Sequence, residues 1–522
     1  MRRRKILGLL PLLTVASCGD AVKPDVTLQT EGLKVANEVS PLYQSYNIEM
    51  AELVGGRFWK PYKDIKGPIG TNSYGVDVTD SSADIYQELP PVNLANERIL
   101  TLAKGLSPAY VRVSGTWANA TYFQGDDTEI QTPPEGFVNI LTAEQWLGLL
   151  DFVKETDSRL MTSFCVSDGV RDKNGIWTPV EAEKIISFSE RNGVRIAAAE
   201  LFNEPNIPTA GGEFSKKDYS AEDYAKDVAV FNTWAEERAP YMLRVGPGTF
   251  GEGLKCFEDF VESQPEMKKL MLGLEDMMTA HPAPEFNVFS YHFYGGVSKR
   301  IMPGPPMGIL EDDAMSEEWI TRTDEAFDYI SAVRDRFAPG EPIWLTETAE
   351  AAGGGDPWSN TFTDTFRYLY QMGSLAQKGL DVHFHNTLLT SEYSLVDHYT
   401  MEPNPSYWAA LLWNRLMGTK AYEVNSGKDD FYVFAHNLKG KDKGISYLLI
   451  NAGEEPVNVA SDKKSDMYML TSESLDSRKI RLNGLEMKMT SDSGLPEISG
   501  KKTDKGVISS PSHAIVFLTI NE

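Results

Sequence analysis

Short β-type runs alternate with longer helical stretches through most of this 522-residue chain, and this alternation constrains the fold more than any other feature. Alternating strand and helix patterns are typical of βα units, which build parallel sheets. A series of eight such units predicts an α/β fold, a closed (β/α)8 TIM barrel. The eight expected strands are Tyr43–Met50, Ala109–Ser114, Leu160–Val166, Ile196–Asn203, Leu243–Gly248, Asn287–Phe293, Pro342–Thr346 and Val382–Asn386. The expected helices between them include Ala143–Glu155, Asp223–Ala239 and Asp364–Lys378, which carry apolar residues at helical spacing.

The pattern changes after a last expected helix at Trp408–Leu416. Beyond it, β-type runs separated by Gly, Asn, Asp and Ser turns predict an all-β sandwich over residues 419–522. The barrel is then expected to cover residues 35–418, and a strand from about residues 24–34 can join the sandwich. The expected strands of the sandwich include Phe431–Ala435, Ile445–Asn451, Lys479–Leu482 and Ala514–Thr519.

Residues 1–17 have the pattern of a secretory signal peptide, with a basic start followed by an apolar run. That run, at roughly twelve residues, is shorter than the roughly 20 residues that a membrane-spanning helix needs. Val15–Cys18 resembles the bacterial lipobox, where the signal is cut and the cysteine receives a lipid. We therefore expect a lipid anchor on Cys18, a polar tether over residues 18–34, and a place in the bacterial cell envelope, on the outer membrane or a periplasmic face. The alternative is an ordinary signal peptide with an incidental cysteine.

The charge balance excludes one class of partner. The chain has 50 Lys+Arg and 75 Asp+Glu, a formal net charge of −25. Nucleic-acid binding depends on basic residues that neutralise phosphates, so we expect no nucleic-acid partner. A polyanionic glycan would meet the same repulsion at long range, and a lightly charged or unsulfated one suits this charge better.

The cysteines and histidines predict neither a disulfide framework nor metal chemistry. Without Cys18 only Cys165 and Cys256 remain, which is too few for a disulfide scaffold. The sequence has no CxxC or HExxH pairing, and its seven histidines are not spaced as a metal cluster. We expect no metal and no cofactor.

Two glutamates stand where expected barrel strands end, at the edge where such barrels carry their active sites. Glu204 follows the fourth strand within Asn203–Asn206, and Glu347 follows the seventh. Retaining glycoside hydrolysis needs two carboxyl groups about 5–5.5 Å apart, one a proton donor and the other a nucleophile. A lone glutamate in such a place is more often a solvated loop acid or a helix N-terminal charge. Here the neighbouring Asn203 can hold a sugar hydroxyl, and Pro205 stiffens the turn that aims Glu204.

Four separated segments carry a resemblance to a known family. They are Gly105–Arg112 with Gly115 and Thr116; Asn203–Asn206; Trp344–Thr348 with Gly353–Gly355; and Tyr393–Asp397 with Tyr407, Trp408 and Gly418–Lys420. In this order they resemble glycoside hydrolase family 79, the heparanase and β-glucuronidase family of the retaining clan with its acid/base on strand four and its nucleophile on strand seven. The resemblance runs from Tyr43 to the C-terminus and matches the sandwich only in outline.

The resemblance implies roles for individual residues. Glu204 would be the general acid/base, Glu347 the nucleophile, and Asn203 the partner of the sugar 2-hydroxyl. The glucuronate carboxylate would be held by the backbone N–H groups of Gly353 and Gly354 and by the Tyr393 hydroxyl. Glu49 and Thr116 match residues that contact the sugar in the family, and His385 stands where mammalian heparanase has a glutamine. His292 and Tyr294 could hydrogen-bond the nucleophile or line the cleft as substrate contacts, or they could form a structural aromatic cluster.

The expected function is a retaining β-glucuronidase or heparanase-like enzyme that cleaves β-linked glucuronic acid from glycans by double displacement, in exo or endo mode. Two alternatives remain open: a glycosidase of the same clan with another sugar specificity, such as a xylosidase or glucosylceramidase-like enzyme, or an inactive glycan-binding surface lipoprotein. The segment Gly55–Lys63 after the first strand mixes basic and aromatic residues and could form a further sugar subsite or simply be solvated surface.

Overall fold

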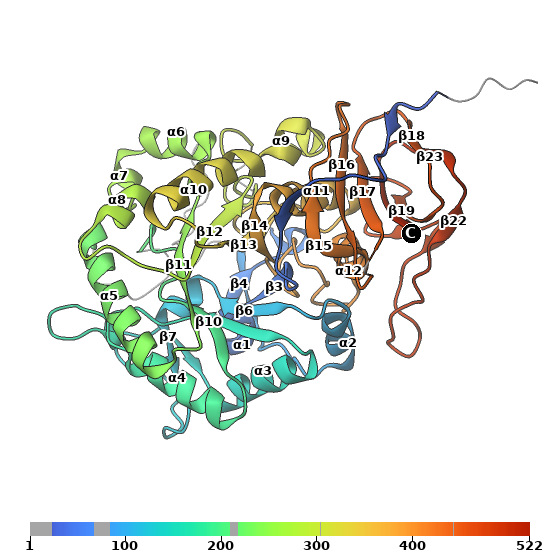
Figure 1. Ribbon diagram of the computed structural model, residues 1–522. Helices are drawn as coiled ribbons and strands as arrows, with labels where there is room; N and C mark the ends of the chain where they lie inside the picture. The colour runs from blue at the N-terminus through green and yellow to red at the C-terminus, as the bar shows by residue number, and fades with distance from the viewer. Residues whose placement is uncertain (1–22, 67–83, 209–217, 303, 442, 522) are drawn as a thin grey trace, which may run out of the picture.

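The computed structural model describes residues 23–66, 84–208, 218–302, 304–441 and 443–521 (Figure 1). Its centre is a closed barrel in which all eight strands pair in parallel with their neighbours in chain order. The expected (β/α)8 barrel is therefore confirmed, and each expected strand overlaps one of its strands. They are β3 (Gln44–Glu49), β6 (Tyr110–Ser114), β9 (Arg159–Ser163), β10 (Ile196–Glu200), β11 (Leu243–Phe250), β12 (Val288–Tyr294), β13 (Ile343–Ala349) and β14 (Leu380–His385).

Most strand ends differ from the expected ones by a few residues, and the differences at β10 and β13 concern the site. Strand β10 ends at Glu200, so Asn203 and Glu204 lie in the turn beyond it. Glu204 has a left-handed backbone with φ of 53°, which is incompatible with an extended strand. Strand β13 continues to Ala349, so Glu347 projects from within the strand.

Helices surround the barrel because their apolar faces pack onto the outside of the strands. Helix α3 (Ala143–Glu155) begins at a capping box between Thr142 and Gln145 and buries Trp146, Leu149 and Val153. The other long helices are α2 (Glu97–Gly105), α4 (Val180–Arg191), α5 (Ala221–Arg238), α10 (Thr323–Phe337), α11 (Phe362–Lys378) and α12 (Pro405–Leu416). Helix α6 (Lys255–Ser263) is as long as α2, and the short helices are α1 (Met50–Val54), α7 (Pro265–Lys268), α8 (Leu274–Thr279) and α9 (Glu317–Thr321).

The C-terminal part forms two packed sheets beside the barrel (Figure 1). Along β17 (Ile445–Asn451), Tyr447 and Leu449 join an apolar cluster with Val457 and Val459 of the smaller sheet. The alternate residue Leu448 belongs to the main core on the other face. The larger sheet also contains β2 (Val35–Glu38), β15 (Met417–Tyr422), β16 (Phe431–Leu438), β19 (Ser465–Ser472), β20 (Ile480–Leu482), β21 (Leu485–Glu486), β22 (Lys501–Thr503) and β24 (Ala514–Ile520).

The start of the described chain pairs with both of these sheets. Strand β1 (Val26–Thr27) lies parallel to β18 (Val457–Ser461), which also pairs with β23 (Gly506–Ser510). Strand β2 pairs antiparallel with β15. Cys18 lies outside the described residues. Within the described part of the chain, no helix combines the length and apolar character needed to cross a membrane.

Candidate active site

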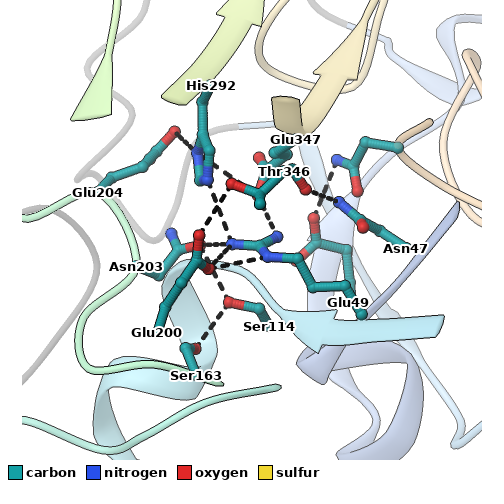
Figure 2. Close-up of polar contacts among 12 residues, drawn as sticks. Asn47, Glu49, Ser114, Ser163, Glu200, Asn203, Glu204, His292, Thr346 and Glu347 are labelled. Atoms are coloured by element: carbon teal, nitrogen blue, oxygen red, sulfur yellow. Dashed lines mark hydrogen bonds and ion pairs between the residues drawn. The ribbon is translucent and has the colours of Figure 1, made fainter. Parts of the chain in front are cut away.

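Glu204 and Glu347 face each other at the C-terminal ends of the barrel strands, with His292 between them (Figure 2). One oxygen of each carboxyl group and one ring nitrogen of His292 all lie within 4.8 Å of one another. The Glu204 side chain is 12% exposed and that of Glu347 is 8% exposed, so both are mostly withdrawn from water yet reachable. This spacing is close to the separation that retaining glycosidases use.

Arg112 of β6 connects the residues of this site from below. Its Nη1 donates to Glu347 Oε2 at 2.9 Å, and its Nη2 donates to Asn203 Oδ1 at 2.8 Å and lies 3.2 Å from His292 Nε2. Its Nε donates to Glu200 Oε2 at 2.9 Å. Arg112 and Glu200 are each 1% exposed, and Glu200 also accepts hydrogen bonds from Thr346 and Ser290. Glu200 thereby holds the Arg112 guanidinium in place beneath the two candidate catalytic acids.

The pKa values of the two glutamates move in opposite directions. Burial raises the pKa of Glu204, the negative charge of Glu347 adds to this, and a hydrogen bond from His292 opposes it. Burial also disfavours the charged form of Glu347, but electrostatic interactions with His292 and Arg112 and hydrogen bonds from Tyr294 and Arg112 outweigh it and lower the pKa of Glu347. The two shifts favour the protonated form of Glu204 and the ionised form of Glu347, which is the arrangement of an acid and a nucleophile.

The turn that carries Glu204 is fixed through Asn203. Asn119 bonds to both backbone groups of Asn203, accepting from its N–H at 3.1 Å and donating to its carbonyl at 3.0 Å. The Asn203 side chain accepts from Arg112 and from the Ser114 hydroxyl. Its Oδ1 is thereby committed to the protein, which leaves the amide N–H group to face a ligand.

A second set of polar residues surrounds Glu347. The Tyr294 hydroxyl donates to Glu347 Oε1 at 2.7 Å. The Asn386 amide donates to the hydroxyls of Tyr294 and Tyr393 at 3.0 and 3.2 Å and to Glu49 Oε1 at 3.0 Å. Burial and the charge of Glu347 raise the pKa of Glu49 well above its ordinary value. A protonated Glu49 can donate a hydrogen bond as well as accept one.

The glycine run after β13 presents unoccupied backbone donors. Gly353 and Gly354 have φ of 81° and 85°, a left-handed conformation that glycine adopts without strain. Among the described residues their N–H groups have no acceptor, whereas the Gly355 N–H donates to the Ala351 carbonyl. Consecutive free N–H groups of this kind can hold an anion.

Within the described chain, the side chains of Thr116 and His385, two of the expected substrate contacts, form no hydrogen bond with Glu204 or Glu347. Thr116 opens a short 3-10 turn (Thr116–Ala120) and is half-buried, and within the described chain its hydroxyl bonds to none of the other site residues. His385 is 1% exposed, and its Nε2 lies 2.8 Å from the Tyr393 carbonyl. Burial lowers the pKa of His385 to about 3, so the ring is neutral and supports the backbone of Tyr393.

Sequence reasoning missed three members of the site: Arg112, Glu200 and Asn386. Arg112 and Glu200 are charged residues inside otherwise apolar expected strands, and a charge in a buried strand is a signal that could have identified them. Asn386 gave no such signal, because an asparagine at a strand end is also typical of an ordinary turn.

Glu204, His292 and Glu347 have a spacing that could also suit a metal ion. However, Arg112 lies within hydrogen-bonding distance of His292 and Glu347. The positive charge of Arg112 opposes a cation at this position. Its N–H groups contact Glu347 Oε2 and His292 Nε2, which a metal would need as ligand atoms. The residue set therefore fits acid–base chemistry better than metal binding.

Relatives with assigned names cover most of the chain. It is 26% identical to a hyaluronoglucuronidase of Hirudo nipponia over 80% of this chain and 88% of that protein. It is 25% identical to a baicalin-β-D-glucuronidase of Scutellaria baicalensis over 79% of this chain and 80% of that protein. It is 24% identical to the heparanase of Mus musculus over 82% of this chain and 86% of that protein. No family model matches the chain.

Solved structures confirm the architecture. A 4-O-α-L-rhamnosyl-β-D-glucuronidase from Fusarium oxysporum 12S superimposes with a TM-score of 0.60 at 12% identity, covering 95% of this chain and all of that one. A family 51 arabinofuranosidase from Xanthomonas axonopodis pv. citri gives a TM-score of 0.59 at 13% identity, covering 96% of this chain and all of that one.

The barrel, the opposed glutamates at its mouth and these relatives define the protein as a glycoside hydrolase. The similarity to heparanases and β-glucuronidases over about four-fifths of the chain confirms the resemblance to glycoside hydrolase family 79 that four separated segments predicted.

Proposed function

We propose that this protein is a retaining β-glucuronidase that cleaves β-linked glucuronic acid from glycans. The observation that carries the proposal is the pair Glu204 and Glu347, whose carboxyl oxygens lie within 4.8 Å of each other and whose pKa values are shifted apart. The names of the relatives support the sugar, because glucuronidases and heparanases cover most of the chain at 22–26% identity. The N–H groups of Gly353 and Gly354, which have no acceptor among the described residues and could hold a carboxylate, also support it.

In the first step, ionised Glu347 attacks the anomeric carbon and Glu204 protonates the departing oxygen. Tyr294 and Arg112 hold one oxygen each of Glu347, so the carboxylate is oriented before substrate arrives. His292 Nδ1 lies 3.0 Å from Glu204 Oε1, which leaves Oε2 to carry the proton that is transferred.

In the second step, Glu204 acts as a base and water releases the sugar from Glu347 with its anomeric configuration retained. The bond to His292 stabilises the ionised form of Glu204 that the first step leaves behind. The free amide N–H of Asn203 would hold the sugar 2-hydroxyl throughout. The same residues thus serve both halves of the double displacement.

The glucuronate carboxylate would bind at the N–H groups of Gly353 and Gly354 and at the Tyr393 hydroxyl. Asn386 donates to the oxygen of Tyr393, so the hydroxyl proton of Tyr393 is available for an anion. A neutral sugar lacks the carboxylate that these donors would satisfy. We therefore expect Tyr393→Phe to raise KM for an aryl β-glucuronide more than for the matching glucoside, and equal effects on both would remove this role.

The proposal is tested with Glu204→Gln and Glu347→Gln, each of which should lower turnover of an aryl β-glucuronide by orders of magnitude. Proton NMR of the first-formed product should show the β anomer if the mechanism is retaining. Sizing the products from hyaluronan, chondroitin and heparan sulfate distinguishes exo action, which gives monosaccharide alone, from endo action, which gives internal fragments. A near-wild-type rate in either variant would overturn the assignment of the glutamates.

We also propose that Cys18 carries a lipid that anchors the protein in the cell envelope. The support is the lipobox-like Val15–Cys18 after an apolar run. Metabolic labelling with a radioactive fatty acid should mark the wild-type protein and leave Cys18→Ala unlabelled. Labelling of both, or of neither, would contradict the anchor.

A further inference from the structure

Two carboxyl groups lie buried beside the glycine run and take no part in the double displacement. Glu350 directly follows β13, Asp356 directly follows Gly355, and each is 0% exposed. We propose that the ionisation of these two residues, which we call the buried acid pair, controls how tightly the glycine run holds the glucuronate carboxylate. The inference rests on the proposed function, because it concerns how that carboxylate site is regulated.

The buried acid pair braces the loop that contains the glycine run. The Asp356 N–H donates to Glu350 Oε2 at 2.9 Å, which closes the chain around residues 351–355. Asp356 Oδ1 accepts from the backbone N–H of Lys299 at 2.8 Å. One carboxyl group therefore joins the two ends of the loop, and the other fastens the loop to the segment after β12. A change in either group acts directly on the backbone that carries the free N–H groups.

The glycine run is close enough to interact with the charge of Asp356. Two trans peptide bonds separate Gly354 from Asp356, so their Cα atoms are at most about 7.6 Å apart. This distance lies within the Debye length of about 8 Å at physiological salt, and burial weakens the screening further. An ionised Asp356 therefore repels an anion held by the N–H groups of Gly353 and Gly354, whereas a protonated one does not.

The buried acid pair is arranged to hold a proton. Glu350 Oε1 and Asp356 Oδ2 are both buried and have no donor within the described structure. Two ionised carboxylates with free oxygens in such a place would be costly, and a proton on one of them lowers that cost. Burial and the charge of Asp356 raise the pKa of Glu350 well above its ordinary value, and burial raises the pKa of Asp356 to about 6. The shifts favour a protonated Glu350 and place the ionisation of Asp356 near pH 6.

The other charged and titratable groups around the pair do not change this result. Those that interact with it are Tyr62, Lys299, Arg300, Asp364 and Arg367. Asp364 and Arg367 form a buried ion pair at 2.6 Å, so their charges largely cancel. Lys299 and Arg300 favour the ionised form of Asp356 but do not overcome its burial. Burial raises the pKa of Tyr62, so that hydroxyl stays neutral.

The test measures calorimetric binding of an aryl β-thioglucuronide and the matching β-thioglucoside, which resist hydrolysis, to the full-length protein between pH 5 and pH 8. For the wild type, we expect Kd for the thioglucuronide to rise at least fivefold more over this range than Kd for the thioglucoside. In Glu350→Gln/Asp356→Asn neither group can ionise, and each amide keeps a carbonyl oxygen for its backbone N–H. The ratio of the two Kd values should then change less than twofold with pH.

The catalytic glutamates and Glu49 are present in both proteins, so a difference between them isolates the buried acid pair. A ratio that is independent of pH in the wild type, or that rises equally in the double variant, would overturn the inference. If the double variant does not fold, Asp356→Asn alone should still flatten the pH dependence, and failure to do so would equally overturn it.

Ser298→Ala is the matched control for a purely structural role. The Ser298 hydroxyl donates to the Gly353 carbonyl at 2.9 Å, so it supports the same loop without titrating. Its loss should change the affinity for the thioglucuronide by the same factor at every pH. Flattening of the pH dependence in Ser298→Ala would show that loop position, and not the charge of the buried acid pair, is the cause.

The same titrations separate this inference from the proposed function. Tighter binding of the thioglucuronide than of the thioglucoside by the wild type at pH 5 supports the carboxylate site, and the double variant then decides the role of the buried acid pair. Equal affinity for both ligands at every pH would refute the carboxylate site itself, and the inference with it.

Discussion

Arg112 lies 3.2 Å from His292 Nε2 through its Nη2, and a guanidinium can only donate in this contact. His292 Nε2 must therefore accept, so Nδ1 is the ring nitrogen that carries a proton. That proton points to Glu204 Oε1 at 3.0 Å. Arg112, which forms no hydrogen bond with Glu204 in the described structure, thus determines through His292 which oxygen of Glu204 is left to carry the transferable proton.

The first prediction concerns pH. Activity requires Glu347 ionised and Glu204 protonated, so kcat/KM should fall below the pKa of Glu347 and above that of Glu204. His292 lowers the pKa of both residues. His292→Asn should therefore move both limbs of the pH profile of an aryl β-glucuronide to higher pH. His513→Asn, in the sandwich, is the control, and limbs that stay in place or move down would refute the arrangement.

The second prediction separates stability from activity. Arg112→Met leaves Glu200, which is 1% exposed, without its cationic partner. Breaking a buried ion pair in this way lowers the free energy of unfolding by about 3–5 kcal/mol. Adding Glu200→Met should recover much of the free energy of unfolding, measured in urea. The double variant should still be inactive, because Glu347 and His292 have lost their donor. Recovery of activity together with stability would show that Arg112 has only a structural role.

The sequence was sufficient to predict the barrel and its two glutamates, because the apolar runs and the residues at their ends are local signals. Glu204 and Glu347 were found from their place after two strands, without knowledge of which residues face them. Arg112 was missed as a site residue because its role depends on Glu200, which is 88 positions away and becomes its neighbour only when the barrel closes. The free N–H groups of Gly353 and Gly354 depend on backbone angles, which a run of glycines permits but does not determine.

The third prediction tests the Tyr294 hydroxyl. Tyr294→Phe removes one hydrogen bond to ionised Glu347, and a bond to a charged group contributes about 1.5–3 kcal/mol. We expect kcat for an aryl β-glucuronide to fall about ten- to a hundredfold and the acidic limb to move to higher pH. Tyr291→Phe on the same strand is a matched control, since within the described structure its buried hydroxyl has no partner. Similar losses in both variants would point to packing as the cause.

The fourth prediction concerns the glycine run. Gly354→Ala would place a methyl group 2.8 Å from Trp59, on a residue whose φ is 85°. The loop would have to move, and its N–H groups would no longer point toward the glucuronate carboxylate. KM for an aryl β-glucuronide should rise at least tenfold, while the matching glucoside should be less affected because it has no carboxylate to lose. Gly440→Ala is the control for backbone strain alone: its φ is 69° and no atom lies within 4 Å of the added carbon. If Gly354→Ala reduced glucuronide and glucoside turnover by the same factor, the glycine run would be a structural loop and carboxylate recognition would have to lie elsewhere.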